Sequence, residues 1–287
     1  MKKIPVRQMR SFKQELVTTE RFSIRRVEDI VGETNLVHDL HRHDFYFILA
    51  VKKGEGLHEI DFTAYEVRDH SVFVLHPGQV HQLELKAGCT GYLLEFNSEF
   101  YHPQGKSSSQ RLRKVGNRNF CAVEESRFNK IQAVLASMFY EYNAREEGYQ
   151  DVIKCDLDIM FVELARVTPH AAGKSNAAAS YTQERFDEFL ELLRRHIATH
   201  KQVSQYTEMM RLSPYQLNEI TKSSVGKTAS DLINEQVILE AKRYLLATSN
   251  QIKDIAEHLG YEDTSYFIRF FRKHIGQSPE AFRHNFG

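Results

Sequence analysis

The chain has no excess charge of either sign, because Lys plus Arg and Asp plus Glu both number 38 among its 287 residues. The net charge therefore gives no reason to expect a polyanionic partner, and binding to nucleic acid would have to come from charges placed locally. Glycine and proline are few, at 14 and 6 residues. These numbers exclude a collagen-like or disordered chain, and the length predicts a globular protein of about two domains.

Long hydrophobic runs and cysteine pairs are missing as well. The start of the chain is basic but lacks the apolar run of a signal peptide, and residues 45–51 form a hydrophobic stretch only as long as one strand. We therefore expect a cytoplasmic protein that does not enter a membrane. Cys89, Cys121 and Cys155 are far apart and lack CxxC spacing, which argues against a disulfide framework and a cysteine zinc site.

The hydrophobic pattern changes along the chain and divides it in two. Between residues 22 and 100, short apolar runs alternate with turn residues, a pattern typical of an antiparallel barrel or sandwich. Apolar residues at helical spacing then predict a hairpin of two helices over about 124–167. Residues 169–180 are small and polar and predict a linker. We expect an α+β protein with domains at 1–168 and 181–287, the second one all-helical.

The helical domain contains one unit twice. Residues 213–232 match residues 263–282 at a constant offset of 50. In each copy a capping residue, Ser213 or Asp263, begins a second helix directly after a first one. Each copy is therefore a helix-turn-helix unit. The helix that joins them, over about 230–247, is about 27 Å long, enough to hold the two units near successive major-groove faces of DNA.

One face of each second helix carries polar residues that suit DNA, since hydrogen-bonding groups can contact base edges and cations can contact phosphates. Ordinary solvated helix faces carry similar residues, but the duplication of caps and glycines favours a DNA interface. Lys plus Arg equals Asp plus Glu within residues 181–287 too, so binding that is independent of DNA sequence should be modest. The predicted contacts are Tyr215, Asn218, Glu219, Lys222, Thr264, Ser265, Arg269, Arg272 and Lys273.

Residues 200–284 resemble the AraC/XylS family of bacterial transcription regulators, most specifically in the segment IKDIAEHLGYEDTSYFIRFFRKHIGQSPEAFR. The resemblance implies that the two helix-turn-helix units bind double-stranded promoter DNA. It also implies an N-terminal jelly-roll domain that binds a small-molecule effector and forms a homodimer, and RNA polymerase as a further partner. The family's landmarks correspond here to Ile255, Ala256, Leu259, Gly260, Ser265, Tyr266, Phe267, Phe271, Arg272, Lys273, Gly276, Ser278, Pro279, Phe282 and Arg283.

Residues 38–100 resemble the cupin-like barrel of the same family, through HDLHRHDFYF, GEGLHEIDF, VLHPGQVH and GYLLEF. Alternation along one strand would place His41, His43 and Phe47 on one face. His41 and His43, followed by His81, look like the metal-ligand framework of cupin enzymes, but Phe47 stands where an acid is wanted. We therefore expect no metal ion and no other cofactor. Either these histidines simply line the barrel, or His41, His43, Phe47 and His81 form a pocket for a small organic effector.

Three functions stay open. The leading hypothesis is a ligand-responsive transcription factor, and the competing one is a metal-dependent cupin enzyme fused to a DNA-binding module. The third is a regulator controlled by a protein partner. Catalytic patterns such as a Ser-His-Asp order or a phosphate-binding glycine loop do not stand out, so we assign no catalytic residue and expect no enzyme. The hairpin at 124–167 either covers the barrel or pairs two chains.

Overall fold

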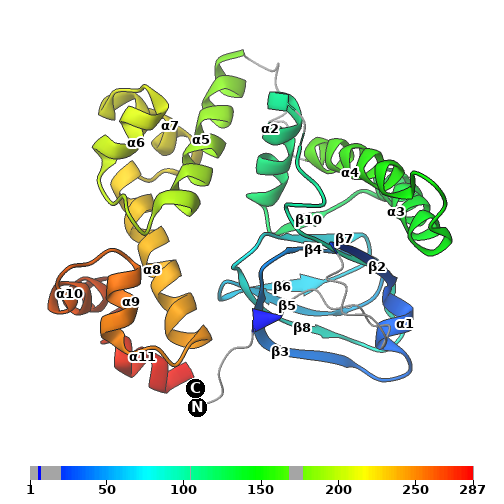
Figure 1. Ribbon diagram of the computed structural model, residues 1–287, viewed down its shortest axis with the longest axis horizontal. Helices are drawn as coiled ribbons and strands as arrows, with labels where there is room; N and C mark the ends of the chain where they lie inside the picture. Colours follow the sequence, from blue (N-terminus) through cyan, green and yellow to red (C-terminus); the bar gives the residue numbers. More distant parts are fainter. Residues whose placement is uncertain (1–5, 8–20, 104, 168–176, 287) are drawn as a thin grey trace. The chain divides into compact units, whose positions relative to one another are not determined.

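The structure is a computed structural model that describes residues 6–7, 21–103, 105–167 and 177–286. These residues fall into two compact units, one within 5–172 and the other within 173–287. The first unit holds the strands and helices α1 to α4, and the second holds α5 to α11 (Figure 1). The predicted α+β class, with β-structure followed by a helical part, is confirmed. Within the described residues, no helix is both long and apolar enough to span a membrane.

The described strands of the first unit form two five-stranded sheets. We name them the β3 sheet, in the order β1-β3-β8-β5-β6, and the β4 sheet, in the order β10-β7-β4-β9-β2. Neighbours are antiparallel, apart from the parallel pair of β1 with β3. The strands are β1 (Val6–Arg7), β2 (Phe22–Arg26), β3 (Leu36–His43), β4 (Tyr46–Lys53), β5 (Gly56–Ile60), β6 (Thr63–Val67), β7 (Ser71–Leu75), β8 (Val80–Leu85), β9 (Thr90–Phe96) and β10 (Phe120–Ala122).

Strand β4 is buried on both of its faces. Its alternate residues point to opposite sides of the sheet. Phe47 and Leu49 therefore lie in the core between the two sheets, whereas Ile48 and Ala50 lie in a second core on the other side. All four side chains are at most 2% exposed. This double burial explains why residues 45–51 form a continuous apolar run rather than an alternating one.

The predicted helical hairpin is present as α3 (Glu125–Ala144) and α4 (Tyr149–Arg166). Buried residues of both helices, such as Phe128 and Leu157, pack in the second core against Ile48 and the outer side of the β4 sheet. One face of the hairpin therefore covers a sheet. Two shorter helices, α1 (Val27–Val31) and α2 (Gly105–Gly116), have no counterpart in the prediction from sequence.

The chain passes from one sheet to the other at residues 44 and 45. Strand β3 ends at His43 and belongs to the β3 sheet, whereas β4 begins at Tyr46 and belongs to the β4 sheet. The prediction that His41, His43 and Phe47 share one strand is therefore wrong. The three side chains still meet, because the inner faces of both sheets turn toward the same core.

The second unit consists of helices arranged around α8, which lies between the pair α6 and α7 and the pair α9 and α10 (Figure 1). Most of the predicted linker, 169–180, lies outside the described residues, but its last four residues are helical because α5 begins at Ala177. The helices are α5 (Ala177–His196), α6 (Val203–Met210), α7 (Pro214–Val225), α8 (Ala229–Ala247), α9 (Ile252–His258), α10 (Thr264–Ile275) and α11 (Pro279–Phe286).

The two copies of the repeat close their turns with the same backbone hydrogen bond. The N–H of Leu212 donates to the carbonyl of Thr207 at 2.9 Å, and the N–H of Tyr261 donates to the carbonyl of Ala256 at 2.8 Å. Thr207 and Ala256, the small residues where the helices cross, are 5% and 0% exposed. The chain therefore turns sharply from α6 into α7 and from α9 into α10, as the sequence predicts.

Candidate functional site

Local capping fixes where the second helix of each copy begins. The side chain of Ser213 accepts a hydrogen bond from the backbone N–H of Gln216 at 3.2 Å, and Pro214 opens α7. The side chain of Asp263 accepts from the N–H of Ser265 at 2.7 Å at the start of α10. Both helices run for 12 residues. Equivalent positions of α7 and α10 therefore remain 50 residues apart along the whole helix.

The same positions are exposed on α7 and α10, although the residue types at these positions differ. Positions i, i+4 and i+7 lie on one side of a helix. On α7 these are Tyr215, Glu219 and Lys222, all exposed, with Tyr215 at 74%. On α10 the same three positions are Ser265, Arg269 and Arg272, which are also exposed.

The opposite faces of both helices are anchored in the core of the second unit. Leu217 and Thr221 of α7 are 0% exposed, and their equivalents in α10, Phe267 and Phe271, are 0% exposed as well. Burying a large apolar side chain stabilises by about 1.5 to 3 kcal/mol. The exposed faces are therefore held on helices that cannot rotate without exposing these anchors.

The face of α10 is more basic than the face of α7. Arg269, Arg272 and Lys273 are exposed on α10, whereas α7 carries Glu219 beside Lys222. The guanidinium of Arg269 lies 3.8 Å from the carboxylate of Asp263, and both side chains are more than 60% exposed. Because an exposed ion pair of this kind contributes little, the guanidinium of Arg269 can exchange Asp263 for a nucleic-acid group.

Two predicted DNA contacts are partly buried. Asn218 is half-buried, and its side-chain oxygen accepts a hydrogen bond from the backbone N–H of Ala229 at 2.9 Å. Thr264 is half-buried at the first position of α10. Tyr266, which was not among the predicted contacts, is 56% exposed and lies one position after Ser265. Its place two turns before Lys273 puts it on the same side of α10.

The predicted pocket residues meet in a cluster between the sheets. His41 and His43 lie on β3. His81 lies on β8, directly opposite His41. Nε2 of His43 lies 2.8 Å from Nε2 of His81, and the ring of Phe47 stacks on that of His43 with centroids 5.4 Å apart. Sequence reasoning missed a fourth member, His58 of β5, whose Nε2 lies 2.8 Å from Nδ1 of His81. We call His41, His43, His58 and His81 the histidine cluster.

Burial lowers the pKa of two imidazoles of the cluster. His58 and His81 are 0% exposed, and His41 and His43 are 1% and 5% exposed. Burial, together with the neighbouring imidazoles, lowers the pKa of His58 to about 3 and holds the pKa of His81 well below its usual value. The Nδ1–H of His41 donates to the carbonyl of Asp39 at 2.6 Å. His58 and His81 are therefore neutral at physiological pH, and each neutral ring has one nitrogen that can bind a metal ion or accept a hydrogen bond.

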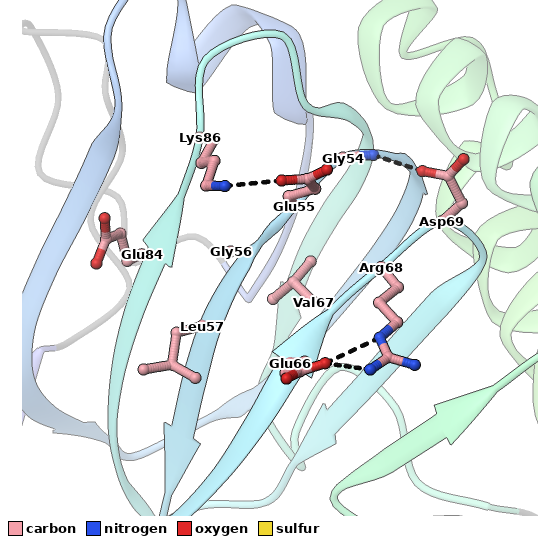
Figure 2. A pocket seen from close by; sticks show the side chains of 10 residues that line it. All are labelled: Gly54, Glu55, Gly56, Leu57, Glu66, Val67, Arg68, Asp69, Glu84 and Lys86. Carbon is pink, nitrogen blue, oxygen red and sulfur yellow. Dashed lines mark hydrogen bonds and ion pairs between the residues drawn. The ribbon is translucent and has the colours of Figure 1, made fainter.

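A separate hollow of about 790 Å³ lies over β5, β6 and β8 (Figure 2) and shares no residue with the histidine cluster. Its charged groups bond one another: Lys86 donates to Glu55 at 2.7 Å, and Arg68 pairs with Glu66. These side chains are 61% to 75% exposed. The hollow is thus an open, solvated surface. It is lined by Gly54, Glu55, Gly56, Leu57, Glu66, Val67, Arg68, Asp69, Glu84 and Lys86.

Comparison with known proteins matches both units to known domains. Residues 206–285 match a helix-turn-helix domain, and residues 30–150 match the AraC-like ligand binding domain. The uncharacterized HTH-type transcriptional regulator YfiF of Bacillus subtilis (strain 168) is 22% identical over 257 residues, which are 85% of this chain and 78% of YfiF. The HTH-type transcriptional activator RhaR of Yersinia pseudotuberculosis serotype O:1b (strain IP 31758) is 20% identical over 255 residues, 86% of this chain and 84% of RhaR.

Among solved structures, ToxT from Vibrio cholerae O395 is similar over 92% of this chain and 97% of its own, with 15% identity and a TM-score of 0.42. The two helix-turn-helix units and the ligand-binding domain together define a DNA-binding transcription regulator. Within that class, the chain belongs to the AraC family.

Proposed function

We propose that one chain reads two successive major grooves of promoter DNA, with α7 in one groove and α10 in the other. The observation that carries this proposal is that equivalent positions are exposed on α7 and α10 within one compact unit. The helix between them, α8, has 19 residues. Its length of about 28 Å is comparable to the spacing of about 34 Å between successive major-groove faces.

The two helices divide the contacts unequally. The guanidinium of Arg269 donates two hydrogen bonds to a guanine edge. Arg272 and Lys273 lie in the last turn of α10, where their cations contact phosphates. On α7, Glu219 accepts from a cytosine amino group and Lys222 contacts phosphate. Of the four remaining predicted contacts, Tyr215, Thr264 and Ser265 reach DNA, whereas the side chain of Asn218 holds the start of α8.

We further propose that α4 pairs two chains into a homodimer. Val152, Cys155 and Ile159 are exposed on α4, with Val152 at 41% and Ile159 at 49%. Their spacing of three and four residues is that of a coiled-coil seam. The other side of α4 is buried against the β4 sheet through residues such as Leu157. A second copy of α4 across a two-fold axis would cover this apolar stripe with an identical one.

The first unit supplies the regulation in this proposal. A small-molecule effector bound by residues 30–150 changes the DNA binding of the second unit, and the protein acts in the cytoplasm on RNA polymerase. RhaR is named a transcriptional activator, which supports the contact with polymerase. The regulator has no enzymatic activity of its own, because Phe47 replaces the acid of a cupin metal centre and the imidazoles are at most 5% exposed, whereas a catalytic site must admit substrate.

Selection of binding sites from random DNA by the full-length chain tests the proposed mode of DNA reading. We expect two preferred blocks of bases whose centres lie about 10 base pairs apart for each chain. Arg269→Ala should weaken the preference for one base within one of these blocks. A single short block would contradict reading by both helices.

A further inference from the structure

We propose that His41, His43 and His81 bind one divalent transition-metal ion of the zinc class inside the first unit. Each of the three places a ring nitrogen within 4.8 Å of the others. Three imidazoles suit zinc, cobalt, nickel or copper, whereas calcium and magnesium prefer oxygen. The sequence favoured an organic molecule at these residues over an ion. The distances between their ring nitrogens favour an ion.

The distances between the nitrogens suit an ion. A zinc ion with nitrogen ligands at about 2.0 to 2.1 Å in a tetrahedron separates those nitrogens by about 3.3 Å. The separation of 2.8 Å between Nε2 of His43 and Nε2 of His81 is slightly shorter, and the upper limit of 4.8 Å for the set is longer. Small rotations of the three rings therefore bring all three nitrogens to bonding distance of one ion.

The second nitrogens of two ligands have the partners that metal-bound histidines use. A ligating histidine donates its other ring N–H to a carbonyl or another acceptor, which fixes its tautomer. The Nδ1–H of His41 donates to the carbonyl of Asp39. If His81 binds the ion through Nε2, its ring proton is on Nδ1. This Nδ1 lies 2.8 Å from Nε2 of His58, which can accept the hydrogen bond. His58 is thus a positioning residue for His81.

The rings of the histidine cluster and Phe47 pack so closely that an ion fits between them better than an organic molecule. The rings of His41 and His81 have centroids 4.4 Å apart, and Phe47 stacks on His43. An organic ligand would have to push these rings apart, whereas an ion occupies only the point between their nitrogens. The ion joins β3 to β8 and, through His58, to β5. Because the ligands are at most 5% exposed, the site is closed, as structural metal sites are.

Metal titration of the full-length chain, purified without a histidine tag and dialysed against a chelator, tests this inference. We expect one Co²⁺ per chain with visible absorption bands, displaced by one equivalent of Zn²⁺. X-ray absorption of the Zn²⁺ form should show three imidazole neighbours. His43→Ala should weaken binding at least 100-fold, and His102→Ala, at an exposed histidine, should leave it unchanged. Wild-type protein that binds less than a tenth of an equivalent overturns the inference.

The positioning role of His58 has its own readout. His58→Ala should weaken Zn²⁺ binding about 10- to 100-fold, and His58→Gln should restore most of the affinity because its amide oxygen can accept from His81. If His43→Ala fails to fold, as judged by circular dichroism, X-ray absorption of the wild type decides: sulfur or carboxylate neighbours overturn the inference. DNA binding measured in parallel separates the proposed metal site from the proposed reading of DNA. Intact DNA binding without metal binding overturns only the metal site.

Discussion

Asn218 fixes the joint between α7 and α8, because its side-chain oxygen accepts the backbone N–H of Ala229 at 2.9 Å. The N–H groups in the first turn of a helix have no partner inside the helix, and Ala229 is 0% exposed. The hydrogen bond therefore satisfies a buried donor at the start of α8. It also links α7 to α8, the helix that separates the exposed faces of α7 and α10.

Replacing Asn218 by Ala should lower the free energy of unfolding by about 1 to 2 kcal/mol, because the buried N–H of Ala229 loses its acceptor. Urea denaturation measures this. Asn218→Asp keeps an acceptor beside a helix start and should remain close to wild type. Wild-type stability of Asn218→Ala, combined with a changed preference at one base pair, would show that Asn218 reads DNA instead.

Arg269 and Lys273 should differ in what their removal does to DNA binding. Arg269→Ala should cost about 1 to 3 kcal/mol on the specific site and relax the preference at one base pair, because a bidentate contact to guanine is lost. Lys273→Ala, the comparison, should weaken all sequences alike and lower the slope of log affinity against log salt by about 1. Fluorescence anisotropy with matched and mismatched duplexes separates them. Equal weakening of every duplex by Arg269→Ala would contradict the assigned role.

Gly260 has a close neighbour that Gly276 lacks. A Cβ on Gly260 would lie 2.0 Å from the carbonyl oxygen of Ala198, whereas a Cβ on Gly276 would meet no described atom within 4 Å. Both have positive φ, 73° and 85°. Gly276→Ala should therefore cost about 1 to 2 kcal/mol of stability, and Gly260→Ala about 1 to 3 kcal/mol more. Thermal unfolding measures both, and equal losses would show that the contact with Ala198 relaxes freely.

The stripe on α4 makes dimerisation testable. Ile159→Glu should convert the full-length chain to a monomer, since a charge in a coiled-coil seam loses its hydration without gaining a partner. Gln150→Glu, on an exposed position of the same helix, should stay dimeric. Sedimentation at micromolar concentration gives the state, and a thiol crosslinker should join two chains through Cys155 only in the dimer. A monomeric wild-type protein would leave the hairpin as a cover for the β4 sheet alone.

The DNA-binding unit could be predicted closely because its signals are local. Ser213 and Asp263 cap the helices that they begin, and each cap depends on residues within three positions. The repeat at an offset of 50 then places α10 once α7 is known. The role of Asn218 could not be predicted in this way, because its partner lies 11 residues away across the turn between two helices.

The first unit was harder to predict because its arrangement depends on contacts between distant strands. The hairpin of β5 and β6 turns at Asp61 and Phe62, both with positive φ, and Phe62 stands where such a turn usually has glycine. His58 reaches His81 only through the register of β5 against β8. A spacing pattern could identify His41 and His43, but the sequence contains no signal that joins His58 to them.

Hydroxyl-radical footprinting of the full-length chain on a selected site shows whether α7 and α10 enter successive grooves. We expect two protected segments on one face of the duplex, with centres about 10 base pairs apart for each chain. Lys222→Ala should weaken protection of one segment and Arg272→Ala protection of the other. A single protected segment, or loss at the same segment in both variants, would contradict the reading of successive grooves by α7 and α10.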